Sequence, residues 1–206
     1  MTRARHEALE AQPVFAALMS PALTLLDVQR AFQVFQAFYA CAEPDLLPQL
    51  APAGLGGLYR PRLSWLAADL AMLDIPALPA VSLDPMPSSR AGLLGVIYAI
   101  EGSALGGQVL QRHLRERLGE GGEGGESFAL RLSYFQRMAE GIGPHWQAVL
   151  NTLRVELNDA SALHPAVDGV EWVFSSLIAL ADAARPERGK LVVRNPSALA
   201  SHRPVP

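Results

Sequence analysis

Apolar side chains recur at every third or fourth position along most of this chain, and that spacing places them on one face of an α-helix. The repeat predicts a first helix over residues 2–19, broken at Pro13, and a second that starts after Thr24 and closes at Glu43–Pro44. Further helices are predicted over residues 61–72, 90–118, 127–139, 144–158 and 165–184, with 46–50 as a short helical turn or loop. No alternating apolar–polar run of strand length occurs, so the pattern predicts an all-α, single-domain bundle of seven or so helices.

Proline and glycine mark the connections between these helices. Four prolines between residues 76 and 87 predict an extended connector, and the glycine-rich stretch 119–125 predicts a flexible loop. We expect residues 1–185 to form the helical domain and residues 186–206 to form a C-terminal tail.

Composition narrows the partners and the compartment. The chain has 206 residues, half of them apolar, and a net charge of −3, so nothing favours binding to nucleic acid or to an anionic membrane. Lys190 is the only lysine, so any clamp for an anion must use arginine. The single cysteine, Cys41, excludes an internal disulfide, and the polar N-terminus lacks the apolar stretch of a signal peptide. We therefore expect a cytoplasmic protein that spans no membrane.

Three glycines interrupt the apolar helix predicted at 90–118, namely Gly102, Gly106 and Gly107. Each interior glycine costs a helix roughly 1 kcal/mol relative to alanine, so some other interaction should offset the loss. One interpretation is that the missing side chains let the backbone approach a large flat ligand. The other is that Gly102 and Gly106 admit a neighbouring helix at close range.

His6 and Glu10 are four residues apart and share one face of the first predicted helix. The carboxylate can reach one ring nitrogen while the other binds a metal, which is the geometry of an axial ligand. The alternative is an exposed histidine on a polar helix. The remaining histidines are interpreted as structural or exposed: His113, His145, His164 and His202.

Common enzyme motifs are missing from the sequence. It contains no Gly-x-Ser-x-Gly elbow, phosphate loop, dinucleotide fingerprint, His-Glu-x-x-His zinc motif or repeated Glu-x-x-His pattern. An enzyme with this sequence would take its reactivity from a cofactor.

The histidine and glycine segments together resemble those of a known family. Thr2-Arg3-x-x-His6-x-x-x-Glu10 is similar to the proximal helix of haem oxygenases, and Glu101-Gly-Ser-Ala-Leu-Gly-Gly-Gln-Val-Leu110 to their distal helix. The likeness covers roughly residues 2–184 and is strongest to the bacterial branch that supplies biliverdin to phytochromes.

The resemblance implies a biliverdin-producing oxidoreductase for which haem is both cofactor and substrate. His6 would ligate the iron, Glu10 would orient the imidazole, and Gly102, Ser103, Gly106 and Gly107 would cover the distal face, with Gly102, Ser103 and Gly106 at the reacting side. O₂ and external electrons would open the ring to biliverdin, CO and Fe²⁺. The implied partners are an electron donor such as a ferredoxin or reductase, and a bacteriophytochrome that accepts biliverdin.

Two positions depart from the family pattern. Animal enzymes carry aspartate where this chain has Ser103, so the water network on the distal face must be built differently. The basic residue that often precedes the histidine by two turns has no counterpart here, and Arg131, with Tyr134 and Arg137 nearby, is the candidate propionate contact; solvated helix charges are the alternative. Likewise the arginines at 112, 115 and 117 form either a docking patch for an acidic donor or a solvated face.

Two other functions stay open. A haem carrier or sensor would bind haem through His6 without turning it over. Ser103, in the place of the aspartate, leaves that alternative open. A thiamin-degrading hydrolase of similar helical architecture would need a catalytic cysteine, for which Cys41 is the candidate, although it is interpreted as a small core residue.

Overall fold

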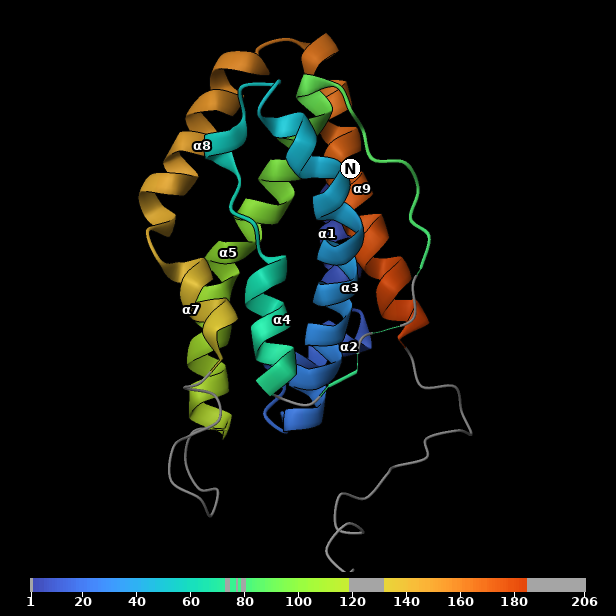
Figure 1. Ribbon diagram of the computed structural model, residues 1–206, viewed down its shortest axis with the longest axis vertical. Coiled ribbons are helices and arrows are strands. Elements are labelled where there is room, and N and C mark those ends of the chain that lie inside the picture. The colour runs from blue at the N-terminus through green and yellow to red at the C-terminus, as the bar shows by residue number, and fades with distance from the viewer. Residues whose placement is uncertain (1, 73–74, 77, 79–80, 119–131, 185–206) are drawn as a thin grey trace, which may run out of the picture.

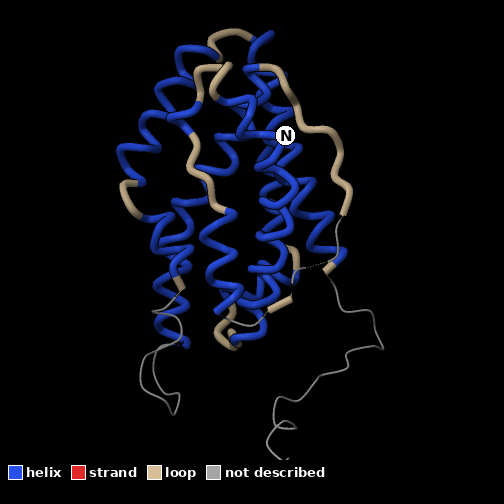
Figure 2. The backbone as a smooth tube through the Cα atoms, viewed as in Figure 1, coloured by secondary structure: helices blue, strands red, loops and turns tan. Residues whose placement is uncertain are grey.

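The computed structural model describes residues 2–72, 75–76, 78, 81–118 and 132–184. Within them the chain forms eight α-helices and two short 3-10 turns, and no β-strand (Figures 1 and 2). The helices are α1 (Thr2–Glu10), α2 (Pro13–Ala16), α3 (Leu25–Leu50), α4 (Leu63–Met72), α5 (Arg90–Leu118), α7 (Ser133–Ala139), α8 (Ile142–Glu156) and α9 (Ala160–Ala183). The all-α fold expected from the sequence is confirmed. The proposed tail, 186–206, and the glycine-rich loop lie outside the described residues.

Helix α3 begins where the sequence predicts and ends later. The Thr24 hydroxyl accepts the Asp27 N–H, and the Asp27 carboxylate accepts the Thr24 N–H at 2.9 Å, which completes the capping box. The prediction that Glu43–Pro44 closes the helix is wrong, because α3 runs through Pro44 to Leu50. The helix contains two interior prolines, Pro44 and Pro48, and each costs about 3 kcal/mol. Burial of Leu46 and Leu50 opposes that cost, at about 1.5–3 kcal/mol each.

Helices α5 and α9 form the centre of the bundle and make its most extensive helix–helix contact. Glycine permits this contact: a Cβ on Gly95 would overlap the Ala166 carbonyl, and one on Gly169 would overlap the Gly92 carbonyl. Helix α5 is long and apolar enough to cross a membrane by length and composition. Half of that apolar window is buried against neighbouring helices, so packing in the bundle accounts for its composition.

The remaining helices pack around this pair with bounds that differ from the predictions. Helix α9 starts at Ala160 and carries Pro165 inside it, because the Asp159 carboxylate caps its N-terminus by accepting the Ala162 N–H at 2.9 Å. Helix α8 starts two residues before Pro144. Helix α7 begins at Ser133, and the predicted helix start at residue 127 lies outside the described residues.

A buried carboxylate on α4 sets the start of α7. Asp69 accepts the Ser133 N–H at 3.0 Å, the Ser133 hydroxyl at 2.9 Å and the Tyr134 N–H at 2.9 Å. These donors at a helix N-terminus have no partner within their own helix, so an acceptor from α4 satisfies them. The cap thereby positions Tyr134 at the beginning of α7.

Candidate functional site

A cavity of about 690 Å³ lies among α1, α3, α5, α7 and α9. This volume falls in the range of small-molecule and cofactor sites, about 300–1,000 Å³. Its walls are mainly aliphatic and aromatic, with a few polar groups at His6, Glu10, Ser103 and the tyrosines. The arrangement suits a large apolar ligand oriented by few polar contacts.

One wall of the cavity is α1, which has no fully buried residue of its own. The His6 ring packs edge-on against Phe174 of α9, with ring centroids 5.6 Å apart, and Arg5 pairs with Glu171 of α9 at 3.0 Å. His6 Nδ1 lies 3.6 Å from Glu10 Oε1. The carboxylate thus faces one ring nitrogen, and His6 lines the cavity.

The opposite wall is the glycine-bearing part of α5. Gly102, Ser103, Gly106 and Gly107 all line the cavity, so the structure brings both sequence motifs to one site. A Cβ on Gly106 would meet nothing within 4 Å, whereas one on Gly102 would lie 3.3 Å from the Trp146 ring. Between the two interpretations of these glycines, the close helix crossing is wrong for Gly106, because the glycines at the α5–α9 crossing are Gly95 and Gly169.

The hydroxyl of Ser103 is turned back onto its own helix. It donates to the Ile100 carbonyl at 2.6 Å, a bond that commits its proton. The oxygen lone pairs remain able to accept a hydrogen bond from a group in the cavity. A serine in this position can hold a donor but brings no negative charge.

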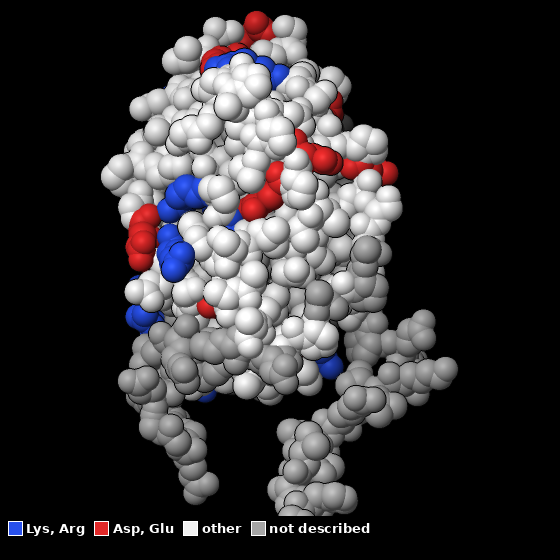
Figure 3. Space-filling view, in the orientation of Figure 1, with Lys and Arg blue, Asp and Glu red and all other residues white. Residues whose placement is uncertain are grey.

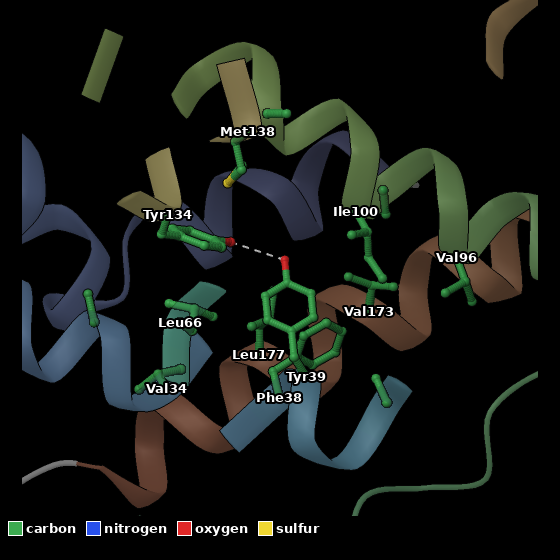
Figure 4. Packing of buried hydrophobic residues seen from close by; sticks show 14 of the residues in the cluster. Val34, Phe38, Tyr39, Leu66, Val96, Ile100, Tyr134, Met138, Val173 and Leu177 are labelled. Carbon is green, nitrogen blue, oxygen red and sulfur yellow. Dashed lines mark hydrogen bonds between the residues drawn. The ribbon is translucent and has the colours of Figure 1, made fainter. Parts of the chain in front are cut away.

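Two tyrosines form the polar part of the cavity floor. The Tyr134 hydroxyl donates to the Tyr39 hydroxyl at 3.3 Å, between α7 and α3 (Figure 4). Burial raises the pKa of Tyr134 well above its usual value, so its phenol stays protonated. Tyr134, predicted from the sequence as a contact of the bound group, lines the cavity as a neutral phenol whose proton is donated to Tyr39.

Behind the part of α5 that carries Gly102 and Gly106 lies a cluster of charged side chains that the sequence did not predict. Glu101 is completely buried, and its Oε2 lies 3.0 Å from Arg62 Nη2, 3.1 Å from His145 Nε2 and 3.3 Å from Arg60 Nη2. Burial by itself lowers the pKa of Arg62, but Tyr39 and Glu101 outweigh it, and the pKa is raised above its usual value. The guanidinium therefore stays charged. A glutamate in the apolar run 92–101 was the one signal that could have pointed to this cluster.

A second buried carboxylate, Glu43 of α3, holds the segment that leads into α4. It accepts the Tyr59 hydroxyl at 2.9 Å and the Arg62 and Leu63 N–H groups at 2.5 and 3.2 Å. Burial, with the neighbouring Tyr39 and Glu43, raises the pKa of Tyr59. This glutamate and Glu101 together hold the buried Arg62 between α3 and α5.

The other candidates from the sequence either lie outside the described residues or do not line the cavity. Arg131 is outside the described residues, and Arg137 stacks on Trp65 at a separate, smaller hollow. The Cys41 thiol donates to the Val81 carbonyl at 3.6 Å and does not line the cavity. The three arginines at 112, 115 and 117 are exposed, and basic side chains form no continuous patch on the face drawn in Figure 3.

The fold and site define a helical protein with a mainly apolar cavity between a histidine-bearing helix and a glycine-bearing one. The chain is 37% identical over 134 residues to a protein named heme oxygenase from Xanthomonas campestris pv. campestris (strain 8004), an alignment that covers 65% of this chain and 75% of that protein. The chain belongs to the haem oxygenase family. No protein-family model matches it, and no solved structure matches it.

Proposed function

We propose that this protein binds haem in the α1–α5 cavity and opens its ring oxidatively, with O₂ and electrons from an external donor, to give biliverdin, CO and Fe²⁺. One observation carries the proposal: His6 and the glycine segment, about a hundred residues apart in sequence, line the same apolar cavity. Family membership supports the same chemistry.

His6 holds the iron in this proposal through Nε2, because Nδ1 faces the Glu10 carboxylate. A carboxylate at that nitrogen orients the ring and raises the basicity of the ligand nitrogen. The edge contact with Phe174 limits rotation of the imidazole.

The distal residues act by shape and by hydrogen bonding. Because Gly102 and Gly106 have no side chain, the backbone of the α5 wall would be able to approach the face of a bound haem, and the mainly apolar lining suits its ring. The Ser103 oxygen can accept a hydrogen bond from a group on that face, and the Tyr39 hydroxyl, which accepts from Tyr134, can donate one. Bound haem supplies the iron and the oxidisable ring; these side chains orient it and hold protons near it.

The test is a haemin titration of the purified protein, followed by a reductant and O₂. We expect a Soret band of histidine-ligated haem, and then bilin absorbance as the band decays. His6→Ala should abolish or shift the band, while His164→Ala, at an exposed position on α9, should leave it unchanged. An unaltered spectrum in the His6 variant contradicts the ligand assignment.

A haem carrier or sensor is the second candidate function, favoured by Ser103 in the place of an aspartate. A stable haem band that never yields bilin would support it. Three finer proposals accompany the enzymatic function: Arg131 as a propionate contact, an acidic electron donor at the exposed arginines of α5, and a cytoplasmic location with biliverdin passed to a phytochrome.

A further inference from the structure

Glu101 occupies an unusual place, because it is a completely buried charge one residue before the cavity-lining Gly102. A helix turns about 100° per residue, so Ser103 lies about 200° and Gly106 about 140° around α5 from Glu101. The carboxylate therefore points away from the cavity, behind the wall that the glycines form.

Three basic side chains converge on this carboxylate from two other parts of the fold. Arg60 and Arg62 come from the segment before α4, and His145 comes from the first turn of α8. Glu101 Oε1 also accepts the backbone N–H of Arg60 at 3.1 Å. Arg62 is completely buried, so its charge depends on this partner. Glu101 thus links α5 to two neighbouring elements at the level of Gly102.

The glycine segment needs such a link from outside. Gly106 has no side chain to pack and nothing within 4 Å of a Cβ position, while the Gly102 position touches only the Trp146 ring. Glycine also favours a helix less than alanine does, so this part of α5 is intrinsically the least rigid. The ion pairs of Glu101, which directly precedes this segment, hold the helix backbone in a defined position without placing a side chain in the cavity.

We propose that Glu101 is a positioning residue, which together with Arg60, Arg62 and His145 sets how far the Gly102–Gly106 segment stands from the ligand. The cluster acts through the helix backbone and touches no ligand itself. The effect on a bound ligand rests on the proposed haem function, whereas the effect on the position of the Gly102–Gly106 segment does not.

The experiment is amide hydrogen exchange in the ligand-free protein, with residues 102–107 compared with the α9 core, residues 170–180. Glu101→Gln removes the charge with little change of shape. That change also leaves Arg62 buried without its partner, which could destabilise the whole protein. His145→Leu therefore serves as a second variant, because it removes a contact of Glu101 and leaves the Arg62 pair intact. His145→Gln keeps a nitrogen donor near Glu101, and His113→Leu removes a histidine of α5 that contacts the Ser20 carbonyl instead.

We expect the exchange rate of the amides at 102–107 to rise about tenfold in His145→Leu and more in Glu101→Gln, while the α9 amides exchange at the wild-type rate. In His145→Gln the rate at 102–107 should stay within about threefold of the wild-type rate. His113→Leu should leave it unchanged. With haem bound, the anchor variants should give a mixture of biliverdin isomers where the wild type gives fewer. Equal acceleration in α9 and in the glycine segment, or none in either, overturns the positioning role. If wild-type protein binds no haemin, the proposed function fails while the exchange data still decide the anchor.

Discussion

Replacement of Gly95 by alanine tests the packing of α5 on α9, on which the whole cavity depends. A Cβ at this position would overlap the carbonyl of Ala166, a backbone atom that no rotamer change can move. The two helices must therefore separate, and overpacking of a core of this kind costs about 1–3 kcal/mol. The upper end applies because backbone meets backbone.

Alanine also returns part of this cost, since it favours a helix by about 1 kcal/mol over glycine. The net loss is then about 2 kcal/mol for Gly95→Ala. In a protein of this size each kcal/mol shifts the Tm by about 2–4 °C, so the variant should melt about 4–8 °C lower.

Gly106→Ala is the matched control on the same helix. Nothing lies within 4 Å of a Cβ there, so only the propensity gain applies and the Tm should rise by about 2–4 °C. The same methyl enters the cavity and should weaken haemin binding. Thermal melts of both variants decide the matter: shifts of equal sign and size would refute the assignment of Gly95 to the helix crossing and of Gly106 to the cavity.

Three further measurements test other parts of the structure. Asp69→Ala removes the acceptor of a buried N–H and a half-buried N–H at the start of α7, and should lower the free energy of unfolding in urea by about 2–4 kcal/mol. An unchanged midpoint would contradict the cap. A hydrogen bond from Arg90 lowers the pKa of Glu156 below 4.5, so its stabilisation is present above that pH and is lost as the pH falls through the folded-state pKa. Glu156→Gln should flatten this acid-dependent part of a Tm-versus-pH curve, and parallel curves would count against the pair. Phe174→Leu removes an aromatic contact worth about 0.5–1.5 kcal/mol and should weaken haemin binding about 2- to 10-fold, measured by absorbance titration.

Local features of the chain determined much of this structure by themselves. Helical periodicity predicted α5 from Arg90 to Leu118 as observed, and Thr24 with Asp27 predicted the start of α3, because both depend on interactions within one or two turns. The i, i+4 spacing likewise predicted that Glu10 faces His6. Each of these features needs no knowledge of the rest of the fold.

Tertiary structure decided what depends on contacts between distant segments. The continuation of α3 through Pro44 depends on burial of Leu46 and Leu50, which a local rule against proline does not include. The sequence suggested both a histidine site and a close helix contact through glycine, but only packing assigned the contact to Gly95 and left Gly106 facing the cavity.

The buried charges show most clearly the difference between what local sequence and what tertiary structure determines. Glu101 and Arg62 are 39 positions apart in the chain, and neither residue type is expected inside a protein without a partner. Folding supplies that partner, and with it a fixed carboxylate behind the glycine wall. The sequence by itself identified the two faces of the site; how those faces are held at a defined separation follows only from the three-dimensional packing, since that depends on which distant charges meet.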